Sequence, residues 1–219
     1  MGLDMFLYQF KKIDKEDDVK DIVNASKLYD FIDFIKRNSI DPRDFFEYTV
    51  CKYNEIDFNI FRKYKKIFKE SNFLEFEEIY RRKANAIHNY LLKNSLEFDE
   101  KIPYEDYNCK YLTILSETLI DLRDRCQLIL DKSEIVDGDI EVSKIFRDDK
   151  IIPVYAEGKI IKDSKIADDL LPTRDGFFHG SIDYDEYYID SLKYTIEKLN
   201  ELFEQDGWDD YVYLYYPYW

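Results

Sequence analysis

The chain has 219 residues, of which 45% are apolar and 17% aromatic, so it can build the core of one large domain. Its formal net charge is −15, from 47 acidic and 32 basic residues. The negative electrostatic field of such a chain repels the phosphate backbone of DNA and RNA, which argues against a nucleic-acid-binding protein. Two interpretations of the acidity stay open, a solubilising surface and a surface that imitates DNA.

The cysteines and the N-terminal residues indicate the cellular compartment of the protein. The three cysteines, Cys51, Cys109 and Cys126, form no CxxC pair, and an odd number argues against a disulfide framework. The start Met1-Gly2-Leu3-Asp4-Met5-Phe6 has no basic region and no long apolar run. No stretch approaches the roughly 20 apolar residues of a membrane span. We therefore expect a cytoplasmic protein that does not contact membranes.

The sequence predicts a strand at each end of the chain. Apolar residues alternate with a period of two over residues 3–10 and again over residues 208–219. Pairing the two in one sheet buries both, so we predict an α+β fold with a small, mostly antiparallel sheet that includes both terminal strands. A Glu157-Gly158 turn predicts a hairpin between Ile151–Tyr155 and Lys159–Ile161.

Helices are predicted between these strands. Residues 13–75 are interpreted as a helical insertion within a single domain spanning residues 1–219. The segment Glu75–Lys93 has a helical apolar pattern, and a second helix follows Thr113 or Ser116. The last predicted helix runs from Tyr184 to Phe203, and we expect the helix that carries Arg81 to pack on the sheet.

A first polar motif borders the apolar stripe of the Glu75–Lys93 segment. At 100° per residue, Arg81, Asn85 and His88 would form one line along a helix, with Arg82 beside them. Arginine, asparagine and histidine together suit a phosphate, a carboxylate or a nucleobase edge. The alternative is that Arg81 pairs with an acidic residue and His88 is a satisfied boundary histidine.

A second motif lies between Leu170 and Ser181, where two of the six glycines fall within five residues. Glycines of this kind permit tight turns and close backbone approach, so the segment predicts a loop that closes over a ligand. The alternative is a β-turn and a short strand that packs two phenylalanine rings. The candidate ligand-binding residues of this motif are Thr173, Gly176, Phe177, Phe178, Gly180, Ser181 and Tyr184.

Catalytic and cofactor signatures are few. His88 and His179 are the only histidines, and no HxH or HExxH spacing, phosphate-binding GxxxxGK[ST] loop, GxGxxG or GxSxG motif occurs. We therefore expect neither a metal nor a cofactor and assign no catalytic residue. A nucleophile pair of Cys109 with His88 stays open.

Three motifs in order resemble a family of uncharacterised proteins from bacteriophages and their bacterial hosts. They are Met1–Phe6, Arg82-Lys83-Ala84-Asn85-Ala86-Ile87-His88, and Leu171–Gly180 followed by Tyr184-Asp185-Glu186. His179 stands where the family more often has an aromatic residue, which argues against a catalytic role. The resemblance implies a phage or prophage accessory protein in the host cytoplasm, and many such proteins counter host defence.

Three function hypotheses follow. The first is a binding protein that sequesters a small anionic, nucleotide-like molecule, for instance a defence signal. The second is a hydrolase or transferase on such a ligand, with His88 as general base. The third is an acidic inhibitor of another protein, such as a DNA mimic. Homo-oligomerisation stays open in all three.

Overall fold

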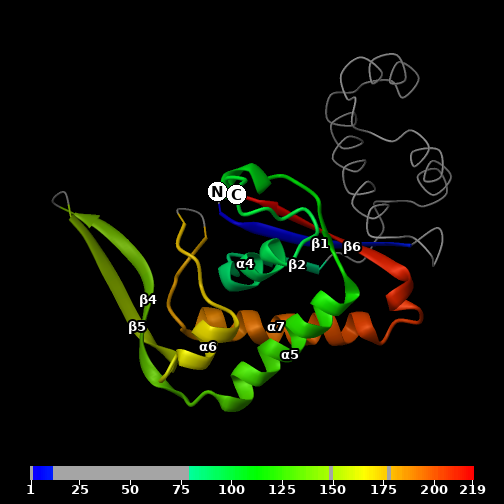
Figure 1. The fold of residues 1–219 in the computed structure, drawn as a ribbon. Coiled ribbons are helices and arrows are strands. Elements are labelled where there is room, and N and C mark those ends of the chain that lie inside the picture. The colour runs from blue at the N-terminus through cyan, green and yellow to red at the C-terminus, as the bar shows by residue number, and fades with distance from the viewer. Residues whose placement is uncertain (1, 12–78, 148–149, 177–178) are drawn as a thin grey trace. The chain divides into compact units, whose positions relative to one another are not determined.

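The computed structural model describes residues 2–11, 79–147, 150–176 and 179–219 (Figure 1). These residues fall into two compact units, each described by itself. Of these residues, 4–11, 79–81, 91–116 and 207–219 belong to the sheet unit, and 2–3, 82–90, 117–147, 150–176 and 179–206 belong to the helix–hairpin unit. The predicted helical insertion over residues 13–75 and Cys51 lie outside the described residues.

The sheet unit confirms the predicted pairing of the terminal strands. Its strands are β1 (Asp4–Lys11), β2 (Ile79–Arg82), β3 (Leu112–Ile114) and β6 (Tyr211–Tyr218), in the order β2-β1-β6-β3. Strand β1 runs antiparallel to β6, from Asp4 opposite Tyr218 to Lys11 opposite Tyr211. Strand β3 is antiparallel to the other edge of β6. The α+β class is therefore confirmed.

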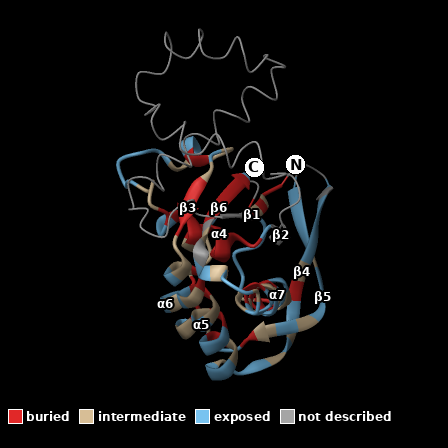
Figure 2. Cartoon of the chain, turned by 90° about the vertical axis from the view of Figure 1, so that its right-hand side faces the viewer, coloured by how far each residue is buried: buried red, intermediate tan, exposed pale blue. Residues whose placement is uncertain are grey.

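The central strand β6 explains the tyrosine-rich end of the sequence. Tyr213, Leu214, Tyr215 and Tyr216 are all at most 7% exposed, so both faces of this strand are covered (Figure 2). The hydroxyl of Tyr213 donates a hydrogen bond of 2.6 Å to the Trp208 carbonyl. A tyrosine buried in this way contributes a large apolar ring and keeps its polar end satisfied.

The helix–hairpin unit holds the strongly periodic helices. Its elements are α4 (Asn85–Lys93, whose last turn belongs to the sheet unit), α5 (Ser116–Lys132), the hairpin β4 (Ile135–Arg147) and β5 (Lys150–Ile161), α6 (Lys165–Leu170) and α7 (Glu186–Phe203). The helix predicted after Thr113 or Ser116 is confirmed as α5, which buries Leu119, Leu122, Cys126 and Ile129.

Helix α7 begins two residues later than predicted. The carboxylate of Asp185 accepts hydrogen bonds from the backbone N–H groups of Tyr187 and Tyr188, at 3.0 and 3.2 Å. This is the geometry of an N-cap, which satisfies donors that the first helical turn leaves open. The Tyr188 hydroxyl donates to the Leu171 carbonyl at 3.0 Å and so ties α7 to the chain that follows α6.

The predicted helix over Glu75–Lys93 is wrong at Ile79–Arg82, and its residues 75–78 lie outside the described part of the chain. Residues Ile79–Arg82 form strand β2, and the helix α4 begins only at Asn85. Lys83 separates the two elements with φ 59°, a left-handed conformation that a right-handed helix cannot contain. Arg81 therefore lies in a strand of the sheet and not on a helix that packs against it.

The predicted turn at Glu157-Gly158 is also wrong. Strand β5 continues through both residues, and Gly158 lies opposite Gly138 of β4. A Cβ atom at Gly158 would approach the Ile140 side chain to 2.7 Å, and one at Gly138 would approach the Ile160 side chain to 2.6 Å. These glycines therefore make room for neighbouring isoleucines within the hairpin.

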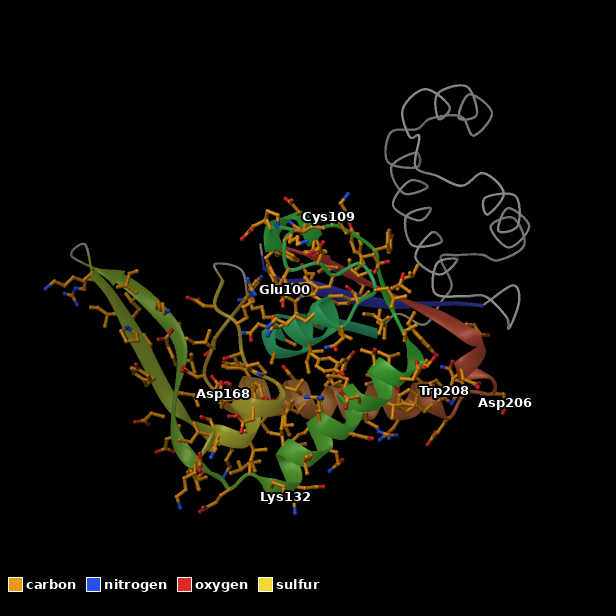
Figure 3. The ribbon with its side chains drawn as sticks, viewed as in Figure 1. Glu100, Cys109, Lys132, Asp168, Asp206 and Trp208 are labelled. Carbon is orange, nitrogen blue, oxygen red and sulfur yellow. The ribbon has the colours of Figure 1, made fainter. Side chains whose placement is uncertain are left out.

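A first prediction concerns Glu97, whose carboxylate accepts hydrogen bonds from both the backbone N–H and the hydroxyl of buried Thr113, each at 2.7 Å. Glu97→Ala leaves two buried donors without this acceptor, and we expect the free energy of unfolding to fall by about 2 kcal/mol. Urea denaturation measures the change. Glu100→Ala, at an exposed position, is the control and should shift stability by less than about 0.5 kcal/mol (Figure 3). Equal midpoints for both variants would contradict the assignment.

Candidate functional site

The buried amide of Asn85 joins the first turn of α4 to the second motif. Its Nδ2 donates to the Ser181 carbonyl at 2.6 Å and to the His179 carbonyl at 3.3 Å. Its Oδ1 accepts from the backbone N–H of Arg174 at 3.2 Å. Asn85 is 4% exposed, and these three bonds use both of its donors and one acceptor position. Asn85 therefore holds the loop in place.

A backbone contact next to Asn85 accounts for the second glycine of the motif. Gly180 has φ 91°, and a Cβ atom there would meet Cβ of Lys83 at 3.2 Å and its carbonyl oxygen at 3.3 Å. Lys83 is itself fixed, because its N–H donates to the Leu3 carbonyl at 2.8 Å. Two left-handed residues thus pack against each other, and only glycine fits at position 180 without strain.

The two histidines of the chain lie together behind this loop. Their ring centroids are 5.3 Å apart in an edge-to-face arrangement. His88 is fully buried and His179 is 4% exposed. The first glycine of the motif is needed here, because a Cβ atom at Gly176 would collide with the His179 ring. The pair therefore fills the interior of the site and does not present two exposed ligand groups.

Electrostatics keep both rings neutral. Burial lowers the pKa of His88 well below its ordinary value, and Coulombic repulsion by Arg174, and by His179 whenever that ring is protonated, lowers it further. Burial and Arg174 also lower the pKa of His179, while Asp175 opposes the shift. At neutral pH both imidazoles are therefore hydrogen-bonding groups without charge, and the positive charge of this site comes from Arg174 and Lys83.

Short hydrogen bonds brace the rest of the loop. The Thr173 hydroxyl donates to the Ile182 carbonyl at 2.8 Å, and the Tyr184 hydroxyl donates to Asp168 at 2.7 Å. The Ser181 hydroxyl donates to Asp183 at 3.2 Å. Because Thr173, Ser181 and Tyr184 are engaged within the loop, their hydroxyls define its shape.

The structure brings most of the predicted site residues together. Asn85, His88, Thr173, Gly176, Gly180, Ser181 and Tyr184 all belong to this loop or to the start of α4 that contacts it. Arg81 and Arg82 lie in β2, so the predicted polar line along one helix is wrong. Phe177 and Phe178 lie outside the described residues.

Sequence reasoning missed the two cations of the site. Lys83 stands in the first motif and Arg174 in the second, and neither was among the predicted ligand-binding residues. Their signal was available, because each is a cation inside a motif of a strongly acidic chain. The described part of the chain contains no group of three or more His, Cys, Asp or Glu side chains suited to a metal ion. In the same part, no helix has the length and apolar character needed to cross a bilayer.

A second prediction tests the clamp formed by Asn85. Asn85→Ala leaves the His179 and Ser181 carbonyls and the Arg174 N–H without their shared partner, and we expect about 2 to 3 kcal/mol of lost stability. The matched control is Asn89→Ala in the same helix, because Asn89 is equally buried but makes one long bond, 3.4 Å, to the Pro172 carbonyl. Urea denaturation measures stability, and trypsin cleavage after Arg174 reports loop opening. Similar cleavage rates in both variants would contradict the clamp.

A third prediction follows from the lowered pKa of His88. The unfolded chain binds a proton at this ring near pH 6.5, whereas the folded protein does so only at lower pH. The stability contributed by the neutral ring is therefore complete above pH 6.5 and is lost as the pH falls below it.

Between pH 6 and pH 5, His88→Gln should reduce the pH dependence of the unfolding free energy by up to about 1.4 kcal/mol per pH unit. Urea denaturation at both pH values gives the two slopes. Parallel slopes for wild type and variant would show that His88 titrates normally in the folded protein.

Comparison with known proteins does not identify a family for this chain. No protein-family model matches the chain, and neither the curated proteins nor the solved structures contain a significant match. The features of the chain that bear on its function are therefore the braced loop, its two cations and the neutral histidine pair.

Proposed function

We propose that the protein binds and sequesters a small anionic ligand of the nucleotide class at the loop formed by residues 172–176 and 179–184. The observation that carries the proposal is the clamp formed by Asn85. It fixes the backbone at Arg174 and holds the loop against the Lys83–Asn85 junction. A cation on a fixed backbone loses less conformational entropy on binding than one on a mobile loop, and preorganised sites bind more tightly.

The position of Arg174 supports an anion as the ligand. Arg174 lowers the pKa values of both His88 and His179, so its positive potential reaches into the interior of the site. The same potential favours a negative group. An arginine fork binds phosphate or carboxylate oxygens through two parallel hydrogen bonds, and Lys83 adds a second, exposed ammonium group.

Burial of the histidines favours binding without chemical conversion. A general base must come within about 3 Å of the proton that it removes. His88 is fully buried and His179 is 4% exposed, so neither ring faces solvent where a ligand arrives. Chemical conversion of the ligand by a hydrolase or transferase would require the loop to open at Gly176. This is the alternative function.

The resemblance of three motifs to phage and prophage proteins supports a biological context for sequestration. Two of the three motifs, Arg82–His88 and Leu171–Gly180, supply the parts of this site. A phage accessory protein that removes a nucleotide signal from the host cytoplasm would require a preformed anion site of this kind. We therefore propose an anti-defence role for the binding activity.

A fourth prediction tests the ligand site through Arg174, whose side chain can be removed while its backbone bond to Asn85 remains. Arg174→Ala should weaken binding by roughly 1.5 to 3 kcal/mol, the contribution of a charge-assisted hydrogen bond, or about one to two powers of ten. Calorimetry with nucleoside mono-, di- and triphosphates, cyclic dinucleotides and pyrophosphate provides the measurement. Lys193→Ala removes an exposed cation from α7 and should leave affinity unchanged.

Mass analysis of the recovered ligand separates sequestration from catalysis. Sequestration predicts that the nucleotide is recovered intact from the wild type. Conversion by the wild type and loss of conversion in His88→Gln would instead support the enzyme. The absence of heat with every compound, together with no small molecule released from the purified protein, would refute the proposal and favour the acidic inhibitor.

A further inference from the structure

The base of the β4–β5 hairpin is joined to the start of α7 through the backbone. The Ile161 N–H donates to the Tyr184 carbonyl at 2.9 Å, and Ile160 forms an isolated antiparallel bridge with Asp185. The Asp185 carbonyl in turn accepts from the N–H of Ile189 at 2.9 Å. Ile161 is 6% exposed and Ile189 is 1% exposed. The chain therefore enters α7 through a junction that is withdrawn from water.

The side chain of Asp185 is buried in this junction, and its two carboxylate oxygens differ in their partners. Oδ1 accepts both N-cap hydrogen bonds, from the N–H groups of Tyr187 and Tyr188. Oδ2 is inaccessible to solvent and accepts no hydrogen bond from the described residues, and the whole residue is 2% exposed. A carboxylate oxygen buried without a donor has lost hydration that the unfolded chain retains. The ionised form of Asp185 is therefore costly in the folded protein.

The neighbouring carboxylates do not relieve this cost. Asp183 lies two residues before Asp185 and repels a negative charge there. The Glu186 carboxylate lies against the hairpin, with its Oε2 2.9 Å from the position that a Cβ atom would take at Gly158. An ionised carboxylate accepts hydrogen bonds but cannot donate them. Neither group can therefore satisfy Oδ2 of Asp185.

The two lysines nearest the bridge in the hairpin are engaged with other partners. The ammonium group of Lys159 pairs with Asp137, and that of Lys162 pairs with Glu134 at 3.0 Å. Because side chains alternate along a strand, Lys159 also points to the opposite face from Gly158, which contacts α7. Neither lysine therefore neutralises the buried carboxylate.

We propose that Asp185 is a proton-dependent switch that sets how firmly the hairpin is held to α7. A proton taken from solvent binds Oδ2 and removes the buried negative charge, while Oδ1 continues to accept the cap bonds. Release of the proton restores the charge and favours opening of the junction, because opening returns Oδ2 to water. The hairpin is thus held most firmly when Asp185 is protonated.

The forces on the Asp185 carboxyl give the direction of this response. Burial raises its pKa, Asp183 raises it further, and the N–H groups of Tyr188 and Tyr187 oppose the shift. The folded chain therefore binds this proton at a higher pH than the unfolded chain, in which the ordinary pKa is 3.8. The added stability is complete below that value and is lost as the pH rises through the folded pKa. Protonation of His88 acts in the opposite direction.

A fifth prediction measures the junction by amide hydrogen exchange at Ile161, whose N–H connects the hairpin to Tyr184. Asp185→Asn keeps an oxygen for the cap but carries no charge. As the pH falls from about 7 to about 4, protection of this amide in the wild type should rise relative to the variant. The relative rise is up to about tenfold per pH unit where Asp185 titrates. The comparison cancels protonation of His88, because both proteins contain that ring.

A second variant and a matched control separate the charge of Asp185 from its role as a cap. Asp185→Ser also caps a helix and places no polar group at the Oδ2 position, so it should behave like Asp185→Asn. Asp190→Asn changes an exposed carboxylate of α7 and should keep the wild-type response. The same pH response in the wild type and both Asp185 variants would overturn the proposal. Protection in the wild type that falls relative to these variants on acidification would overturn it too.

Discussion

The position of the loop against the start of α4 depends on the side-chain amide of Asn85. This planar group forms its hydrogen bonds in fixed directions. Asn85 offers two N–H donors to the His179 and Ser181 carbonyls and one oxygen to the Arg174 N–H. Aspartate would present oxygen to both carbonyls, and glutamine would place the same group one methylene away. Because the amide is buried, losing it leaves several polar groups without water to replace it. The loop therefore has one well-defined position on the helix, and its cation is presented from that position.

The left-handed backbone at Lys83 makes this clamp possible. It ends β2 and lets α4 begin two residues later, so that Asn85 falls in the first helical turn. It also places the Lys83 carbonyl and Cβ against Gly180. A non-glycine residue at positive φ costs about 1 kcal/mol or more and persists where surrounding contacts favour it. Here those contacts are the Leu3 carbonyl and the loop itself.

The sequence predicted the elements whose pattern is long and regular. The stripe of α5, the capped helix α7 and the pairing of the terminal strands all follow from periodicity over eight or more residues. Strand β2 spans four residues, too few to distinguish from a helical turn by periodicity. Gly158 was predicted to lie in a turn because glycine is common in turns. Glycine also occurs within strands where a neighbouring side chain is large, and Gly158 lies beside Ile140 in this way. Nothing local encodes that Asn85 meets Ser181, 96 residues away. The two motifs lie in contact and Arg81 lies in a strand, while the ligand-binding roles assigned to their residues stay predictions.

Under the proposed function, the neutral histidine pair would link ligand binding to protons. Burial and the Arg174 charge lower the pKa of His88 and of His179. An anion bound at Arg174 would offset that charge, and the pKa values of both rings would rise. Linkage is reciprocal, so if the anion raises the proton affinity of the rings, protons raise the affinity for the anion. Burial still opposes protonation, because a charged ring would remain out of water. The site would thus bind a charged ligand most strongly on the acidic side of neutrality, until protonation of the buried rings begins to destabilise the loop that Asn85 holds.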